Sequence, residues 1–278
     1  MDKLKILVAC HKPWKVCQDE VYTPIHVGRA VSKYKDEMAD MIGDDTGDHI
    51  SEKNPLYAEM TAQYWAWKNL HDVEYIGFCH YRRFFDLQLT NESIDNLFRK
   101  YTVVFIKEKD KIPIIKDAER WISEEDITIF LMVLKKRFPA YEKAALDYLW
   151  GKEWHSRNMF VCKKNLFDQY AAWMFDILAE CEKYIRPSDY SHRHKIYAYL
   201  GELFMPVFFI HHGCRIKNVG YVNSLGMKTG NILQMKKKLK KWMDNIYLYF
   251  NAKPKSFEGY YDRNVLEGFK IDNIYPQL

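Results

Sequence analysis

The residues with the clearest chemical potential are His80, Tyr81, Arg82 and Arg83, which directly follow the apolar run 75–79. The run predicts a buried strand, and in parallel α/β sheets ligands bind at the carboxyl ends of the strands. Guanidinium groups bind phosphates in a bidentate way and keep their charge. We therefore predict that Arg82 and Arg83 lie on either side of a locally extended chain and bind a diphosphate, with His80 and Tyr81 beside them. The alternative is that one arginine pairs with an acidic loop and the other faces water.

A second pair of polar residues, His11 and Lys12, follows the apolar run 4–9. Nucleotides often dock directly after the first strand of an α/β sheet, so we predict that both residues contact the same ligand. The chain contains neither GxGxxG nor GxxxxGK[ST], which disfavours a dinucleotide fingerprint and a P-loop. The sequence thus predicts a nucleotide site without a glycine cradle.

An acidic loop at 43–52 carries Asp44, Asp45 and Asp48. Such carboxylates can bind ribose hydroxyls, a sugar or a metal, and we favour ribose or sugar contact by one or two of them. Their spacing does not match a calcium loop. The alternative is that they cap turns and the helix that follows Pro55.

The segment 56–70 predicts an amphipathic helix on which Trp65, Lys68 and Asn69 are not easily explained by packing. An aromatic ring beside amide and ammonium groups suits sugar recognition. We therefore predict that these three residues contact the same ligand as the arginines.

Short apolar runs alternate with helical patterns, which predicts an α/β fold with a mainly parallel sheet and helices on both faces. Strands are expected at 4–9, 39–43, 75–79, 103–106 and 158–162. Helices are expected at 26–34, 56–70, 92–100, 123–138, 140–150 and 165–185. Because no repeat or Pro/Ser-rich linker interrupts the pattern, we predict one domain over residues 1–225 and a helical tail over 226–278.

Composition predicts a large globular core and a cytoplasmic location. The chain has 278 residues, of which 48% are hydrophobic and 16% aromatic. Its first residues lack an apolar run of signal-peptide length, and its longest apolar run, 203–210, is far below a membrane span. No CxxC or HExxH spacing occurs, so no metal site is predicted. The net charge of +5 is unevenly placed, which favours an anionic ligand or surface over nucleic acid.

Five stretches, GDDTGDHISEKNP, EMTAQYWAWKN, YIGFCHYRRFF, SRNMFVCKK and YLGELF, follow one another in this order. Together they closely resemble the bacterial polysaccharide glycosyltransferases of the family called domain of unknown function 4422, over roughly residues 4–222. His49, Ala58 and Phe84 stand where the family leads us to expect asparagine, cysteine and tyrosine. These small departures leave the resemblance intact.

The resemblance implies a nucleotide-sugar-dependent transferase of capsule, exopolysaccharide or O-antigen synthesis with a GT-A-like, Rossmann-type fold. Some relatives look like galactofuranosyltransferases, so the expected donor is a UDP-sugar carrying galactofuranose or another hexose. Ordinary GT-A enzymes carry a DxD motif at the end of the strand that 75–79 would form, where a divalent metal neutralises the diphosphate. This chain has Arg82 and Arg83 there. We hypothesise that they supply part of that charge and that no cofactor is required, with a divalent metal as the alternative.

A transferase of this kind needs a base that takes the proton of the acceptor hydroxyl. Glu202 is a lone acid in the apolar stretch 198–209, where a buried charge is costly unless it has a partner or a function. Glu202 is our first catalytic candidate, and the alternative is a structural ion pair with Arg193. Asp48 is the second catalytic candidate.

Four further residues are predicted to bind the acceptor. His155, Arg157 and Asn158 lie at the start of the strand expected at 158–162, and Asp189 follows the helix expected at 165–185. An asparagine in such a place holds either a hydroxyl or a turn, and both interpretations stay open. His155 and Asp189 are also weaker candidates for the base.

The tail predicts a basic amphipathic helix. Apolar residues recur at three- and four-residue spacing over 232–249, while Lys236, Lys237, Lys238, Lys240 and Lys241 share the other face. Such a helix fits an anionic membrane surface, and a lipid-linked saccharide acceptor would lie there. We therefore predict peripheral attachment to the inner face of the cell membrane. The alternative is that the apolar stripe packs on the domain and the lysines face water.

The leading prediction is an enzyme that moves a sugar to a saccharide hydroxyl by single displacement with inversion. The alternative is a non-catalytic carbohydrate-binding or scaffold subunit of a polysaccharide assembly complex. Hydrolysis of a nucleotide sugar would favour the enzyme, and saccharide binding without nucleotide affinity would favour the scaffold.

Overall fold

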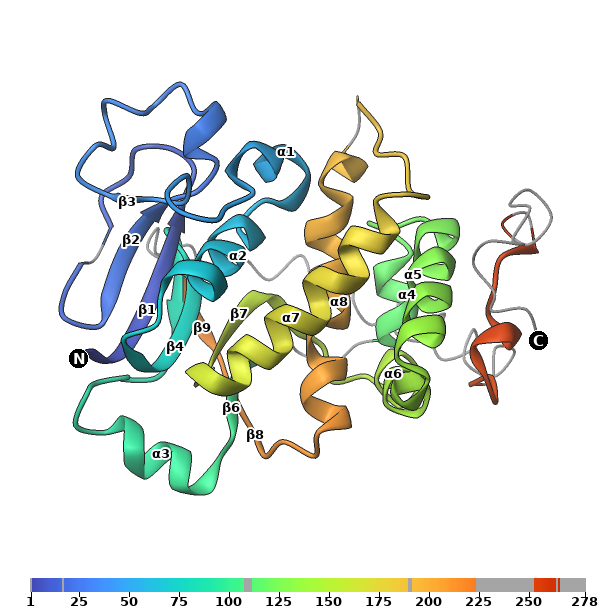
Figure 1. The fold of residues 1–278 in the computed structure, drawn as a ribbon. Helices are drawn as coiled ribbons and strands as arrows, with labels where there is room; N and C mark the ends of the chain where they lie inside the picture. The colour runs from blue at the N-terminus through green and yellow to red at the C-terminus, as the bar shows by residue number, and fades with distance from the viewer. Residues whose placement is uncertain are drawn as a thin grey trace, which may run out of the picture.

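The computed structural model describes residues 2–16, 18–107, 112–189, 192–223, 253–263 and 265, which form a central sheet with packed helices (Figure 1). The strands are β1 (Asp2–Cys10), β2 (Tyr22–His26), β3 (Ile42–Gly43), β4 (Val73–His80), β5 (Arg83–Phe85), β6 (Val103–Lys107), β7 (His155–Lys163), β8 (Ile216–Val219) and β9 (Tyr221–Asn223). The α-helices are α1 (Asn54–Tyr57), α2 (Met60–Asn69), α3 (Ile94–Lys100), α4 (Ile114–Ala118), α5 (Glu124–Arg137), α6 (Glu142–Leu149), α7 (Lys164–Cys181) and α8 (Ile196–His211).

The described strands form a nine-stranded sheet in the order β3-β2-β1-β4-β7-β6-β8, with β5 paired to β4 and β9 paired to β5. β1 is parallel to both β2 and β4, β2 is parallel to β3, and β6 is parallel to β8. β7 is antiparallel to both of its neighbours, β4 and β6. The predicted mainly parallel sheet is therefore confirmed, with β7 as a reversed strand near its centre.

Helices cover both faces of the sheet, as predicted. Side chains alternate between the two faces of a strand, so Tyr75 and Phe78 on β4 point in opposite directions. The ring of Phe78 lies 5.0 Å from that of Phe167 on α7. The ring of Tyr75 lies 4.8 Å from that of Phe98 on α3. The two contacts assign α7 and α3 to opposite faces.

A close approach between α2 and α8 orders the centre of the molecule. Gly201 on α8 faces the first turn of α2, where a Cβ atom on residue 201 would lie 2.2 Å from the sulfur of Met60. A larger residue at 201 would require the Met60 side chain to move, so glycine allows the two helices to pack with Met60 in this position. Because Glu59 precedes Met60 and Glu202 follows Gly201 in the sequence, this packing also fixes the backbone of two acidic residues.

Two of the predicted helices differ from the structure. The first is the helix expected at 26–34, whose first residue, His26, is the last residue of β2. The chain stays extended there because the backbone N–H of Val27 donates to the carbonyl of Cys10 on β1 at 2.9 Å. A left-handed Gly28 follows, and only the turn Arg29–Val31 is helical. The helix expected at 56–70 is divided into α1 and α2 at Ala58, which has φ 46°.

The described part of the tail packs against the domain. Phe257 is fully buried, and its backbone N–H donates to Glu142 Oε1 on α6 at 2.7 Å. The backbone N–H of Asp262 donates to Thr128 Oγ1 on α5 at 3.0 Å. The predicted basic helix over 236–241 lies outside the described residues. Of the helices that the structure describes, none has the length and apolar character needed to cross a membrane.

Candidate active site

A cavity of about 200 Å³ opens where β1 and β4 end. We call it the cationic cavity. It is lined by Ala9, His11, Val27, Asn54, Ala58, Glu59, His80, Tyr81, Arg82, Arg83 and Lys195. Because β1 and β4 are parallel neighbours with Ala9 opposite His80, the polar residues that follow the two strands meet at one edge of the sheet. Five of the predicted ligand-binding residues are thus brought together here.

The chain reverses at the two arginines instead of staying extended. His80 pairs with Arg83 across an antiparallel ladder, so Tyr81 and Arg82 form the turn between β4 and β5. The guanidinium of Arg82 lies 5.0 Å from the centre of the Tyr81 ring, which packs edge-on against His11 at 5.3 Å. Within the described part of the chain, the buried hydroxyl of Tyr81 has no hydrogen-bond partner. A bound ligand could therefore take that hydrogen bond.

The electrostatics of the cationic cavity favour an anion. Burial lowers the pKa of Arg83, and the nearby charges of Arg157 and Arg82 act in the same direction. Burial also lowers the pKa of His11, helped by the charges of Lys195, Lys12 and Arg82. Each shift reports positive charge gathered in a partly desolvated space. A phosphate group would relieve this repulsion.

Glu59 is the carboxylate of the cationic cavity, and the sequence did not single it out. It follows Ala58, whose positive φ of 46° is uncommon for a residue other than glycine. The side-chain amide of Asn54 donates to the carbonyl of Ala58 at 2.7 Å and supports this break. The side-chain amide of Asn158 donates to Glu59 Oε1 at 2.7 Å. Asn158, which was predicted to bind the acceptor, is buried and orients Glu59.

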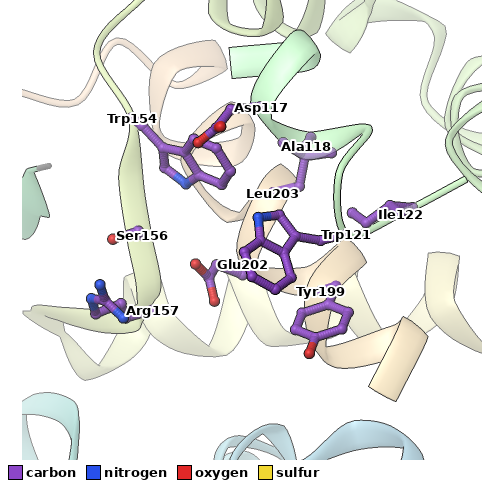
Figure 2. A pocket seen from close by; sticks show the side chains of 10 residues that line it. All are labelled: Asp117, Ala118, Trp121, Ile122, Trp154, Ser156, Arg157, Tyr199, Glu202 and Leu203. Atoms are coloured by element: carbon purple, nitrogen blue, oxygen red, sulfur yellow. The ribbon is translucent and has the colours of Figure 1, made fainter. Parts of the chain in front are cut away.

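A second cavity, of about 280 Å³, lies between α4, the start of β7 and α8. We call it the aromatic cavity. It is lined by Asp117, Ala118, Trp121, Ile122, Trp154, Ser156, Arg157, Tyr199, Glu202 and Leu203. In Figure 2 the side chains of Trp154, Glu202 and Trp121 turn toward the same space. Glu202 and Arg157 are the two predicted site residues that it contains.

An irregularity in β7 connects the two cavities, because Arg157 lines the aromatic cavity and contacts His80 of the cationic cavity. The register of β7 against β6 shifts between the pairs Phe105–Phe160 and Lys107–His155. Within this bulge, Arg157 and Asn158 have φ values of 73° and 51°. The carbonyl of Arg157 lies 2.6 Å from His80 Nε2, at the end of β4. Left-handed residues other than glycine cost free energy and cluster at functional sites.

The acidic loop is fastened to the domain, and Asp44 holds it in place. Asp44 is fully buried. Its oxygens accept hydrogen bonds from the backbone N–H groups of Gly28 and Arg29 at 2.8 and 3.1 Å. They also accept from the hydroxyl of Ser51 and, at 2.6 Å, from that of Thr61. With four donors engaged, Asp44 shapes the backbone beside the cationic cavity.

Five other predicted residues lie outside both cavities. Trp65 Nε1 donates to Thr46 at 2.8 Å, and Asn69 donates to the carbonyl of Asp48 at 2.8 Å. Lys68 lies 3.8 Å from the Asp48 carboxylate, and Asp45 lies 3.6 Å from Arg29. The contacts of Trp65, Lys68 and Asn69 join the acidic loop to α2, and that of Asp45 joins it to the turn after β2. A ligand-binding role for these five residues stays a prediction.

Lys12, His155 and Asp189 are likewise not part of either lining. Lys12 lies 5.9 Å from the Trp14 ring, next to His11. His155 is buried, and its Nε2 lies 2.8 Å from the side-chain oxygen of Asn218. Asp189 is exposed. Over the described ranges, no group of three or more His, Cys, Asp or Glu side chains could hold a metal ion.

Sequence reasoning also missed Lys195, Trp121 and Trp154. Lys195 immediately precedes α8 and reaches the cationic cavity from a segment far from β1 and β4 in the chain. Trp121 lies in the short connection between α4 and α5, where no periodic pattern marks it. What identifies Trp121 as a candidate binding residue is its 49% exposed side chain, which only the structure shows.

The strand order, the two reversed strands β5 and β7 of the described sheet, and the helices on both faces define a mixed α/β protein. The family model described as domain of unknown function (DUF4422) matches residues 5–213, and the chain belongs to this family. The fold is similar to that of a solved apo structure of the bifunctional glycosyltransferase WbbM, with a TM-score of 0.69 and 24% sequence identity. The match covers 80% of this chain and 45% of that one. A comparison with curated proteins gives no match.

Proposed function

We propose that the protein is a glycosyltransferase that moves a sugar from a nucleoside diphosphate sugar to a saccharide hydroxyl. The observation that carries this proposal is a pair of cavities linked through Arg157, which lines the aromatic cavity and whose carbonyl contacts His80 of the cationic cavity. One is lined by Arg82, Arg83 and Lys195 and suits a diphosphate. The other is lined by Glu202 and aromatic rings and suits a sugar.

The chemistry follows from the charges. The diphosphate departs with the electron pair of the sugar–oxygen bond, and Arg82, Arg83 and Lys195 stabilise the negative charge that develops on it. On the other side, Glu202 takes the proton of the attacking hydroxyl as its oxygen bonds the anomeric carbon. Attack opposite the leaving group gives a single displacement with inversion. The charge of Glu202 acts on Arg83, which supports its location at the boundary between the cavities.

The finer identity of the donor is part of the proposal. We propose a UDP-sugar that carries galactofuranose or another hexose, in line with the resemblance of YIGFCHYRRFF and its companion stretches to polysaccharide glycosyltransferases. The similarity of the fold to WbbM, described as a bifunctional glycosyltransferase, supports this class of reaction. No divalent metal is required in the proposed mechanism, because the two arginines supply the charge. Turnover that is lost with a chelator and restored only by a divalent ion would overturn this point.

The acceptor and the location are proposals of the same kind. A lipid-linked saccharide of capsule, exopolysaccharide or O-antigen synthesis is the proposed acceptor. The basic segment that contains Lys236 and Lys241 would hold the enzyme on the inner face of the cell membrane.

A panel of nucleotide sugars tests the proposal. The purified protein is heated with UDP, UDP-hexoses and other nucleotide sugars, since a ligand that binds only the folded state raises the melting temperature. The nucleotide sugars that stabilise it are then followed for slow hydrolysis, which releases the nucleoside diphosphate. Stabilisation together with hydrolysis supports the transferase. Saccharide binding without any nucleotide effect would favour the scaffold alternative.

A further inference from the structure

The aromatic cavity contains an exposed aromatic side chain, Trp121, that has no part in the proposed binding of the donor diphosphate. Trp121 is one of three large hydrophobic side chains that are strongly exposed in the described part of the chain. It lines the cavity beside Tyr199 (Figure 2), and the centres of the two rings are 6.5 Å apart. An indole that remains 49% exposed beside a hollow leaves apolar area available for a ligand.

The polar groups of this cavity suit hydroxyls. The indole N–H of Trp154 is buried and, among the described residues, has no hydrogen-bond acceptor. Asp117 and Glu202 add carboxylate oxygens, although Asp117 also accepts a hydrogen bond from Arg120. A sugar ring presents an apolar C–H face and hydroxyls at its rim. A cavity with aromatic walls and a few convergent polar groups matches both.

The two cavities differ in the charge of the side chains that line them. The cationic cavity has three cationic side chains, Arg82, Arg83 and Lys195, against one carboxylate, Glu59. The aromatic cavity is lined by two carboxylates, Asp117 and Glu202, and one cation, Arg157, while Arg120 outside the lining pairs with Asp117. An anion therefore favours the first cavity, whereas the second should accept an uncharged ligand and disfavour an additional carboxylate.

We propose that the aromatic cavity binds an uncharged saccharide, with one face of a sugar ring packed on Trp121 and its hydroxyls bonded to Asp117, Glu202 and Trp154. The bulge at Arg157 and Asn158 separates this sugar from the cationic cavity. A hydroxyl bonded to Glu202 faces that boundary. The identification of this sugar as the acceptor rests on the proposed function, but its binding does not.

The experiment measures saccharide and nucleotide binding separately on the full chain. The probes are methyl β-galactoside, methyl β-glucoside and methyl β-glucuronide, followed by saturation-transfer NMR and calorimetry, with and without UDP. The variants are Trp121→Ala and Trp121→Phe. The matched control is Val31→Ala, because Val31 is a large apolar residue, 56% exposed, that lies outside both cavities. Thermal melting confirms that each variant is folded.

We expect a neutral glycoside to bind, Trp121→Ala to weaken it at least tenfold, and Trp121→Phe to retain part of the affinity. Val31→Ala should leave it unchanged, and the glucuronide should bind at least tenfold more weakly than the glucoside. Binding that ignores Trp121→Ala, equal binding of the glucuronide, or no glycoside binding would each overturn the proposal. If UDP fails to bind while Trp121-dependent glycoside binding persists, the donor proposal fails and the saccharide proposal for the aromatic cavity stands. If UDP binds and no glycoside does, only the saccharide proposal fails.

Discussion

The side-chain amide of Asn158 donates a 2.7 Å hydrogen bond to Glu59 Oε1 and so joins the bulge of β7 to the break between α1 and α2. Ala58, Arg157 and Asn158 are the positive-φ residues other than glycine in the described ranges. Ala58 lines the cationic cavity, Arg157 lines the aromatic cavity, and Asn158 bonds Glu59. The strained backbone is thus concentrated around the two cavities.

Ala58→Gly should stabilise the protein. With φ 46° and ψ −130°, residue 58 occupies a conformation that glycine adopts readily. Relief of about 1–3 kcal/mol of strain is partly offset by about 0.4–1 kcal/mol of extra entropy in the unfolded chain. We expect the free energy of unfolding in urea to rise by about 0.5–2 kcal/mol, whereas Ala58→Val should lower it. A glycine variant less stable than the wild type would contradict the assignment of strain.

Arg82→Ala and Arg83→Ala should each weaken the binding of UDP. Loss of a charge-assisted hydrogen bond to phosphate costs about 1.5–3 kcal/mol, which is roughly a tenfold to hundredfold rise in Kd. Lysine at either position should restore little, because it lacks the bidentate geometry. Calorimetric titration measures the effect, and Arg99→Ala on α3 is the control, since this exposed arginine lies outside both cavities. Unchanged affinity in both alanine variants would refute the diphosphate role.

The location of the site could be predicted because it depends on short-range patterns. An apolar run followed at once by polar residues marks a strand end, and this occurs after both β1 and β4. Parallel pairing then brings His11 and His80 to one edge of the sheet, as the register of Ala9 against His80 shows. The general rule for ligands in α/β sheets was sufficient for this part.

The rest depends on tertiary packing that no local pattern encodes. Ala58, Glu59 and Met60 have helical propensities, so the sequence did not indicate the break before Glu59. The break occurs because the side-chain hydrogen bond from Asn54 to the carbonyl of Ala58 competes with the helix. Asp44 has the residue type and the place of a ligand-binding group, and only its four hydrogen-bond donors reveal that it organises a loop. Trp121 belongs to a connection whose position is set by the helices around it.

The lysines of the tail give a prediction that concerns lipid binding. If they attract anionic lipid at about 1 kcal/mol each, then changing Lys236, Lys238 and Lys240 to Gln should weaken vesicle binding roughly a hundredfold. Added salt should weaken the wild type in the same direction, because surface charges are screened over about 10 Å at 0.1 M. Co-sedimentation with vesicles that contain phosphatidylserine is the measurement. The matched control changes three exposed lysines of the domain, Lys33, Lys143 and Lys152. Binding that ignores both salt and the tail substitutions would mean that these lysines only face water.

Stability should fall in mild acid because of His26. This side chain is fully buried, and within the described residues neither ring nitrogen has a hydrogen-bond partner. Burial lowers its pKa, against the opposing effect of the Asp44 charge and with the support of Arg29. Since the unfolded value is about 6.5, the unfolded chain binds more protons below that pH, and the free energy of unfolding should decrease as the pH falls through this range. His11 and His212 also have lowered pKa values and act in the same direction.

Urea unfolding of the wild type and of His26→Gln at pH 7.5, 6.5 and 5.5 checks this expectation. The variant cannot be protonated, so its free energy of unfolding should depend less steeply on pH between 6.5 and 5.5. The comparison uses differences between pH values, so a general loss of stability in the variant does not obscure the result. Identical slopes for the two proteins would show that another group causes the acid sensitivity.

Glu202→Gln tests the assignment of the base. Glutamine keeps the size and much of the hydrogen bonding of glutamate but cannot accept the hydroxyl proton, so turnover should fall by roughly a hundredfold or more. The affinity for UDP and the melting temperature should stay close to those of the wild type. Asp48→Asn is the matched comparison, because Asp48 is exposed, contacts Tyr64 and Lys68, and lies outside both cavities. Release of UDP from a donor that the protein hydrolyses gives the rate of each variant. If Asp48→Asn loses turnover while Glu202→Gln keeps it, the base lies in the acidic loop, and that loop must then approach the acceptor during the reaction.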